Sequence, residues 1–222
     1  MSGAGTPGGL VALVLAGGDL TAARLTAPLL EGVEVVVAAD GGLRHAAALG
    51  LTPDLVVGDL DSLTQETLSA HPGVRVESYP RAKDQLDLEL AIAAARERGA
   101  TAVRVIGAFG DRLDQSLAAL LIAARAAQGD PPFPVTLAGG THEARVCVPG
   151  TPYEADLPAA TTVSLLALSG GTVATAAGLR YPVEALELPV GVGLGVSNAA
   201  AGGRVKVRCD SGVLAVVVEH GA

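Results

Sequence analysis

The chain has 222 residues, half of them hydrophobic, and 15 Lys and Arg against 23 Asp and Glu give a formal net charge of -8. This length suffices for one large domain or two modest ones with real cores. Only two Phe, three Tyr and no Trp occur, so small aliphatic packing is expected to dominate. Because the charge opposes contact with a nucleic-acid backbone, we expect no nucleic-acid partner.

The sequence indicates a cytoplasmic protein. Its two cysteines, Cys147 and Cys209, each stand in an apolar-alternating stretch and give no support to a disulfide framework. The first residues, MSGAGTPGGL, lack a basic leader region, and no run approaches the roughly 20 apolar residues that span a bilayer. We therefore expect no association with a membrane.

From Leu10 to about Arg125, Val- and Leu-rich runs alternate with Ala-rich stretches, as in βα units of a parallel sheet. Strands are expected at 11–17, 33–40, 53–59, 74–80 and 102–108. Helices are expected at 21–30, 43–50, 63–70, 86–99 and 113–129. This pattern predicts an α/β domain with a doubly wound, mostly parallel sheet over residues 1–140.

The pattern changes after Gly129. DPPFP is a Pro-rich break, 135–140 is one more expected strand, and no long helix follows. Strand-like runs separated by Gly, Pro and Asn stand at 142–148, 161–168, 171–176, 185–190, 203–209 and 212–220. They predict an antiparallel β-sandwich. We place the domain boundary at Thr141, so that the second domain covers residues 141–222.

Carboxylates follow four successive strands, at the edge where ligands collect in an open parallel sheet. These residues are Asp40, Asp59, Asp61, Asp84, Asp87, Asp111 and Asp114. In GDLDS the spacing directs Asp59 and Asp61 to one side of an extended turn, where they could hold Mg²⁺ beside a triphosphate. An equally weighted alternative is that one of them caps the next helix.

The segment KDQLD begins a helix and places Asp84 and Asp87 on one face near its positive end. An ordinary acidic first turn would look the same, and only the conjunction with GDLDS makes Asp87 a candidate third metal ligand. Lys83 could meet a phosphate, although a solvated lysine is the alternative. Gly17 and Gly18 end the first strand and permit close approach of a phosphate or sugar.

In GAFGDRLDQ, Arg112 could neutralise charge on a transferred phosphoryl group, and Asp114 could orient an attacking hydroxyl. A surface ion pair between them is the open alternative. The four histidines show no metal-ligand spacing and are interpreted as structural or solvent-facing. No P-loop and no full GxGxxG motif is present, which disfavours a P-loop kinase or an ordinary dehydrogenase.

Taken in order, five segments closely resemble thiamine pyrophosphokinases over nearly the whole chain. They are ADGGLRHAAALGLTPDLVVGDLDSL, KDQLDLELAI, GAFGDRLDQSLA, GLRYPV and VSNAA. The resemblance implies transfer of a pyrophosphoryl group from ATP to thiamine, which gives thiamine diphosphate and AMP. It also implies a homodimer whose active sites lie between subunits.

By the same resemblance, Asp59, Asp61 and Asp87 look like Mg²⁺ ligands, and Asp40 and Asp114 look like active-site carboxylates. Arg112 looks like a phosphate contact, and Tyr181, Ser197 and Asn198 fall where the family contacts thiamine. The sequence departs from the family at Leu86, Asp111 and Tyr181. Two alternatives follow: a pyrophosphokinase acting on another hydroxymethyl heterocycle such as a pterin, or a non-catalytic thiamine or nucleotide sensor.

Overall fold

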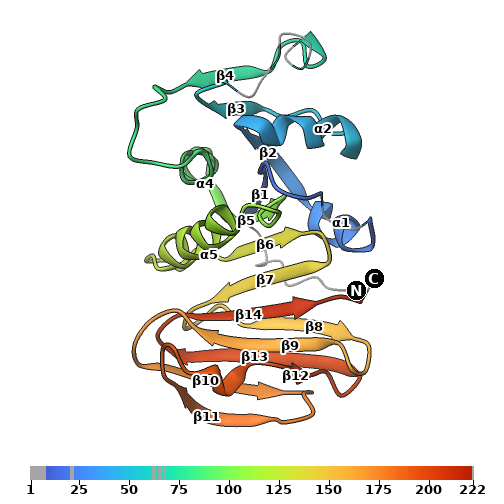
Figure 1. Ribbon diagram of the computed structural model, residues 1–222, viewed down its shortest axis with the longest axis vertical. Coiled ribbons are helices and arrows are strands. Elements are labelled where there is room, and N and C mark those ends of the chain that lie inside the picture. Colours follow the sequence, from blue (N-terminus) through green and yellow to red (C-terminus); the bar gives the residue numbers. More distant parts are fainter. Residues whose placement is uncertain (1–8, 21–22, 62–63, 65–66, 68, 222) are drawn as a thin grey trace. The chain divides into compact units, whose positions relative to one another are not determined.

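The structure, a computed structural model, describes residues 9–20, 23–61, 64, 67 and 69–221 (Figure 1). The described chain forms two compact units. The first contains the residues up to Ile122 together with Leu137–Gly140. The second contains Ala123–Thr136 and the chain from Thr141 onward.

The first unit is built on an open sheet with the strand order β6-β5-β1-β2-β3-β4. Strand β1 pairs in parallel with β2 and β5, and parallel pairing continues through β3 to β4. The strand order reverses at β1, which makes a crevice at the carboxyl end of this strand. The strands are β1 (Leu10–Leu15), β2 (Val33–Ala39), β3 (Leu55–Gly58), β4 (Arg75–Ser78), β5 (Ala100–Ile106) and β6 (Val135–Gly139).

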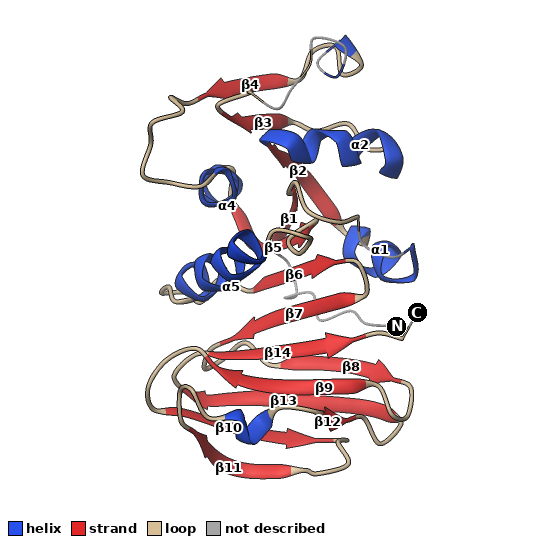
Figure 2. Ribbon diagram, in the orientation of Figure 1, coloured by secondary structure: helices blue, strands red, loops and turns tan. Residues whose placement is uncertain are grey.

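Helices cover both faces of this sheet, with α1 and α2 on one side and α4 and α5 on the other (Figure 2). They are α1 (Ala23–Leu30), α2 (Leu43–Leu49), α4 (Asp87–Glu97) and α5 (Leu113–Ala127). The doubly wound α/β prediction is therefore confirmed. Half of the helix expected at 63–70 falls outside the described residues. None of the described helices is both long and apolar enough to cross a membrane.

Small aliphatic side chains fill the core of the first unit, as the composition predicts. Strand β1 is buried along most of its length, because helices cover both faces of a parallel sheet. Leu13, Leu15 and Ile106 are fully buried and pack with Leu43 of α2. Helix α2 is thereby anchored directly over the carboxyl end of β1, which fixes the residues around the crevice.

The second unit is an antiparallel β-sandwich, as predicted. Its two layers are the strands in the order β12-β9-β14-β7 and a four-stranded sheet with the order β11-β10-β13-β8. The sequence did not indicate β8 and β12, which are short. The strands are β7 (His142–Cys147), β8 (Tyr153–Leu157), β9 (Thr162–Ala167), β10 (Thr172–Ala177), β11 (Val183–Leu188), β12 (Asn198–Ala199), β13 (Gly203–Ser211) and β14 (Leu214–Glu219).

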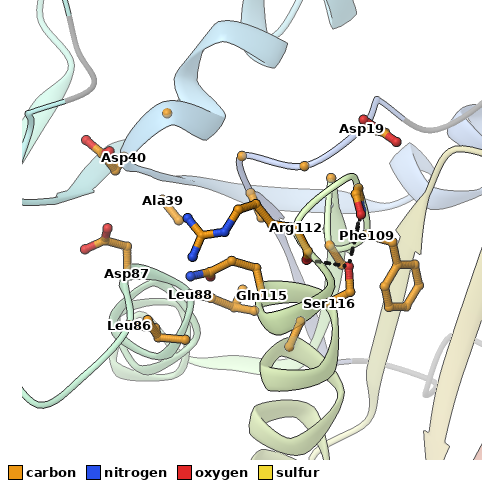
Figure 3. Close-up of a pocket in the computed structure, with 18 of the residues that line it drawn as sticks. Asp19, Ala39, Asp40, Leu86, Asp87, Leu88, Phe109, Arg112, Gln115 and Ser116 are labelled. Atoms are coloured by element: carbon orange, nitrogen blue, oxygen red, sulfur yellow. Dashed lines mark hydrogen bonds between the residues drawn. The ribbon is translucent and has the colours of Figure 1, made fainter.

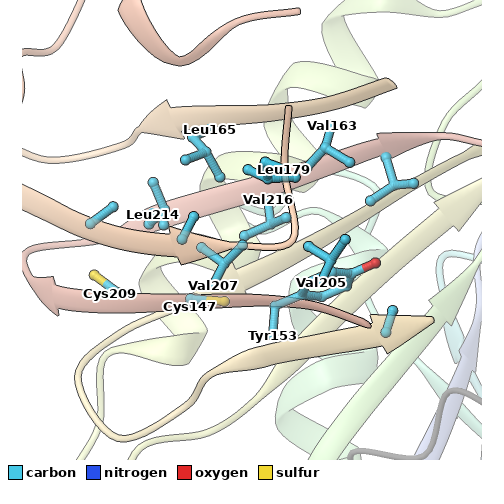
Figure 4. Packing of buried hydrophobic residues seen from close by; sticks show 14 of the residues in the cluster. Cys147, Tyr153, Val163, Leu165, Leu179, Val205, Val207, Cys209, Leu214 and Val216 are labelled. Atoms are coloured by element: carbon cyan, nitrogen blue, oxygen red, sulfur yellow. The ribbon is translucent and has the colours of Figure 1, made fainter. Parts of the chain in front are cut away.

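Alternating side chains of the two sheets interdigitate in the sandwich core (Figure 4). Tyr153, Val205 and Val216 are nearly or fully buried there. Both cysteines belong to the same core as free thiols. Burial raises the pKa of Cys147 to about 12 and that of Cys209 to about 11. The thiols are therefore protonated packing residues.

Candidate active site

A pocket of about 520 Å³ opens at the carboxyl edge of the parallel sheet, in the first unit (Figure 3). Its walls come from the turns after β1, β2 and β5 and from the first turns of α4 and α5. Both helices direct their N-terminal, partly positive ends toward the pocket. Polar lining residues include Asp19, Asp40, Arg44, Asp87, Asp111, Arg112, Gln115 and Ser116.

Three carboxylates meet beside this pocket. Asp40, Asp59 and Asp87 each offer an oxygen within 4.8 Å of the other two, and all three side chains are half-buried. They reach one place because β2 and β3 are parallel neighbours, and Asp87 begins the helix that packs on both strands. Carboxylate oxygens are ligands that suit Mg²⁺, so this set fits a divalent cation.

The other predicted ligand, Asp61, is not one of these three, but it adjoins Asp59. Its carboxylate is 3.3 Å from Arg81 Nη2, and its backbone N–H donates a 3.2 Å hydrogen bond to Asp59 Oδ1. That hydrogen bond is the largest cause of a lowered pKa of Asp59, and the charges of Lys83 and Arg81 act in the same direction. Asp59 is thereby favoured in its ionised, metal-binding form.

Lys83 and Asp84 precede helix α4 but differ in their surroundings. Lys83 Nζ lies 2.8 Å from Asp87 Oδ1, and the lysine side chain is only 15% exposed. Asp84 is exposed and belongs neither to the pocket lining nor to the carboxylate cluster. Of these two predicted nucleotide contacts, only Lys83 therefore adjoins the cluster.

Arg44 and His45, which no sequence motif indicated, hold the turn formed by Gly17 and Gly18. Arg44 Nη2 donates hydrogen bonds to the carbonyl oxygens of Gly17 and Gly18, the latter at 3.2 Å. The His45 Nε2 lies 2.8 Å from the Gly18 carbonyl oxygen. The sequence places both residues close after the ADGG segment, which could have drawn attention to them. Their hydrogen-bond partners, Gly17 and Gly18, lie 26 or 27 residues away in sequence.

The Gly18 position admits no side chain. A Cβ atom there would lie 2.4 Å from the Phe109 carbonyl oxygen and 2.5 Å from that of Gly107. The Gly18 N–H donates to the latter oxygen at 2.8 Å. Close approach of two backbones therefore explains this glycine, and both predicted glycines, Gly17 and Gly18, line the pocket.

Arg112 and Asp114 form a two-point ion pair at the start of α5. Arg112 Nε and Nη2 lie 2.9 and 2.5 Å from the two carboxylate oxygens of Asp114. This hydrogen bonding lowers the pKa of Asp114 to about 2. Arg112 lines the pocket and extends toward Asp40 and Asp87, whereas Asp114 is not among the lining residues (Figure 3).

The three residues predicted to contact thiamine lie in the second unit. Asn198 Nδ2 donates to the Tyr181 carbonyl oxygen at 2.7 Å, and the Tyr181 N–H donates to Asn198 Oδ1 at 3.1 Å. The Tyr181 side chain is 62% exposed, and the Arg180 guanidinium lies 5.6 Å from its ring centre. Ser197 adjoins this pair in a left-handed conformation, with φ of 62°.

Two family models cover most of the chain. Residues 26–132 match the thiamin pyrophosphokinase catalytic domain, and residues 153–214 match the thiamin pyrophosphokinase vitamin B1 binding domain. The comparison with curated proteins found no match.

Solved structures with these names share the fold. Thiamine pyrophosphokinase from Bacillus subtilis is 22% identical, covers 96% of this chain and 100% of its own, and superposes with a TM-score of 0.81. The Geobacillus thermodenitrificans protein is 25% identical over 96% and 99%, with a TM-score of 0.76. The Candida albicans protein is 16% identical over 95% and 90%, also with a TM-score of 0.76.

Fold and pocket together define a two-unit α/β protein with a carboxylate cluster at the edge of a parallel sheet. The chain belongs to the thiamin pyrophosphokinase family. The resemblance drawn from the sequence motifs is confirmed. Neither the pterin acceptor nor the sensor alternative is favoured.

Proposed function

We propose that this protein transfers the pyrophosphoryl group of ATP to the hydroxyl of thiamine, with AMP as the leaving product. The observation that carries the proposal is the convergence of Asp40, Asp59 and Asp87 at the rim of a 520 Å³ pocket. An acidic protein can bind a polyphosphate there if a divalent cation lies between the carboxylates and the phosphates and neutralises both.

Mg²⁺ is the proposed cofactor, held by Asp40, Asp59 and Asp87 in the arrangement described above, with Asp61 as a further predicted ligand. When bound, it would neutralise charge on the phosphates and on the leaving AMP. The cluster suits it chemically because all three donors are carboxylate oxygens within 4.8 Å of one another.

The chain's own cations complete the proposed nucleotide site. Arg112 extends into the pocket from the start of α5, where its guanidinium can pair with phosphate oxygens. Arg44 and His45 fix the Gly17–Gly18 turn against which the nucleotide would lie. Catalysis by this arrangement consists of positioning and charge neutralisation, and needs no covalent enzyme intermediate.

Thiamine binding is assigned to Tyr181, Ser197 and Asn198, within the segment that matches the vitamin B1 binding model. The exposed Tyr181 ring can pack on the cationic thiazolium of the substrate. The mutual hydrogen bonds of Tyr181 and Asn198 support this assignment, since they fix the backbone that carries the ring.

A homodimer is proposed from the family and is supported by exposed apolar side chains. Leu113, Leu117 and Leu121 are 69%, 55% and 62% exposed at successive turns of α5. Such a stripe at four-residue spacing is suited to packing against a second copy of the chain. A molecular mass from light scattering tests this assembly state directly.

A cytoplasmic location is likewise proposed, since both cysteines are buried as free thiols. Thiol titration of protein prepared without reductant should yield two reactive groups per chain after unfolding. A result of zero reactive thiols would count against a cytoplasmic location.

The reaction is tested by incubating purified protein with ATP and Mg²⁺, with and without thiamine. The products are then identified by mass. Thiamine-dependent AMP together with thiamine diphosphate is the expected result. Absence of AMP in the presence of thiamine would refute the proposal. Chelation of divalent cations should stop the reaction, and their return should restore it.

A further inference from the structure

The loop 79–86, between β4 and α4, brings two cations to the aspartates of the site. Arg81 Nη2 lies 3.3 Å from Asp61 Oδ2, and Lys83 Nζ lies 2.8 Å from Asp87 Oδ1. Their surroundings differ, because the Arg81 side chain is 82% exposed and that of Lys83 is 15% exposed. Lys83 is therefore the cation that the fold encloses next to the carboxylate cluster.

The Lys83 ammonium acts on two of the three clustered carboxylates. It contacts Asp87, and its charge contributes to lowering the pKa of Asp59. An ammonium nitrogen 2.8 Å from Asp87 Oδ1 stands where a divalent ion would approach, since metal-to-oxygen distances for Mg²⁺ are about 2.0–2.1 Å. The ion must then displace this ammonium or bind against its repulsion.

We propose that Lys83 couples entry of the divalent metal to entry of the nucleotide, by occupying Asp87 when the site is empty and moving to a phosphate oxygen when nucleotide is bound. This inference rests on the proposed ATP and metal site. Lysine suits such an exchange because it is a compact charge on a flexible four-carbon stem. Free metal alone gives the displaced ammonium no new partner, whereas a nucleotide brings phosphate oxygens.

A merely structural role for Lys83 has a different signature. Lys83 stands in the loop before α4 and Asp87 is the first residue of that helix, so a structural ion pair would do no more than hold the loop against the helix. If that were its whole effect, removing the charge would lower thermal stability slightly and leave metal affinity unchanged. Metal affinity measured without nucleotide therefore distinguishes the two roles.

The experiment is a Mn²⁺ titration followed by electron paramagnetic resonance, on wild type and Lys83→Met, with and without α,β-methylene ATP. Without nucleotide, Lys83→Met should bind Mn²⁺ about tenfold more tightly, because one positive charge has left the cluster. With the analogue present, the Mn²⁺ affinity of Lys83→Met should be lower than that of wild type. In wild type, the nucleotide analogue should increase the affinity for Mn²⁺ by the same factor as Mn²⁺ increases the affinity for the analogue. This factor should be smaller in Lys83→Met.

Two further variants separate charge from other effects. Lys83→Arg keeps the positive charge and should bind Mn²⁺ as weakly as wild type without nucleotide. Lys206→Met removes a lysine that lies 3.5 Å from Glu154 on the sandwich, and should leave every Mn²⁺ affinity unchanged. Thermal unfolding of each variant checks that the fold is retained.

Equal or weaker Mn²⁺ binding by Lys83→Met without nucleotide overturns the role of Lys83. Failure of the underlying site is seen separately. If Asp59→Asn and Asp87→Asn bind Mn²⁺ as wild type does, the metal is not held by this cluster, and both the proposed site and the coupling role are wrong.

Discussion

Gly58 lies directly against Asp40: a Cβ atom added to the glycine would stand 2.8 Å from the Asp40 Cβ and 3.2 Å from Asp87 Oδ1. Gly58 also has φ of 151°, a conformation that side chains rarely adopt. The end of β3 is therefore shaped so that two carboxylates from other elements can approach it.

Gly58→Ala should separate these carboxylates and lower kcat/KM about 100-fold, since an error near 1 Å in a positioned site has effects of this size. The Mn²⁺ affinity should fall in parallel. Gly50→Ala is a matched control, because Gly50 also has positive φ, at 64°, but nothing lies within 4 Å of its added Cβ. The control should lose stability and keep its metal affinity. Wild-type Mn²⁺ binding by Gly58→Ala would contradict the arrangement.

Asp59→Asn and Asp61→Asn should differ in severity. Asp59 belongs to the cluster with Asp40 and Asp87, whereas the Asp61 carboxylate contacts Arg81. We expect loss of Mg²⁺-dependent turnover for Asp59→Asn and a smaller loss, about tenfold, for Asp61→Asn, comparable to loss of an outer-shell contact. Steady-state rates across a range of Mg²⁺ concentrations make the comparison. Equal losses would mean that Asp61 joins the metal ligands, as the sequence motif predicts.

His45 should act through the turn that it holds. His45→Leu removes the group 2.8 Å from the Gly18 carbonyl oxygen and should raise the KM for ATP several-fold with little change in kcat, as expected when binding alone is weakened. His45→Gln can retain a donor and should restore much of the lost affinity. A loss of kcat with unchanged KM would show that His45 does not act through nucleotide binding.

The same histidine predicts a pH dependence of stability. Burial is the main cause that lowers the pKa of His45, so the folded protein binds this proton less readily than the unfolded chain. The stabilising contribution is full above the unfolded pKa of about 6.5 and is lost as pH falls through the lower folded value. Thermal midpoints across this window should fall more steeply for wild type than for His45→Gln. Parallel curves would argue against it.

Asp114 should not set the acidic limb of the pH–rate profile. Its hydrogen bonds from Arg112 bring its pKa to about 2, so it stays ionised at working pH and is a weak proton acceptor. Asp114→Asn should therefore shift the rate without moving the pH at which activity declines. Its pH–rate profile, compared with wild type, makes the measurement. A displaced acidic limb in the variant would assign the titrating group to Asp114 after all.

The α5 leucines offer a test of assembly. Leu117→Glu places a charge in the middle of the exposed stripe formed with Leu113 and Leu121, and should shift a dimer toward monomer in light scattering. Ala93→Glu places the same charge at an exposed position of α4 and is the comparison variant outside the stripe. An unchanged mass for Leu117→Glu would locate the contact elsewhere.

The fold was predictable because its signals are local. Val- and Leu-rich runs alternating with Ala-rich stretches indicated the parallel sheet. The Pro-rich break at 130–134 marked the change from alternating strands and helices to strands alone. Strand β8 escaped notice although Tyr153, Ala155 and Leu157 are buried in alternation. It has only five residues and follows a turn that contains Pro152, so its period-two signal is short.

The grouping of the site residues was less predictable. Spacing within GDLDS suggested that Asp59 and Asp61 act together, yet the carboxylate that joins Asp59 and Asp87 comes from Asp40, 19 positions earlier. Its place depends on the register of β2 against β3, which no local motif encodes. The bonds from Arg44 and His45 to the Gly17–Gly18 turn likewise depend on how α2 packs over β1.

Every residue that lines the 520 Å³ pocket belongs to the first unit, whereas Tyr181 and Asn198 belong to the second. The two sets of residues therefore lie over different hydrophobic cores. A laboratory selection for a new acceptor could vary the residues around Tyr181 and leave the phosphate chemistry undisturbed. If Tyr181 and Asn198 contact the acceptor as proposed, substitutions there should change acceptor binding and leave the residues of the pocket in place.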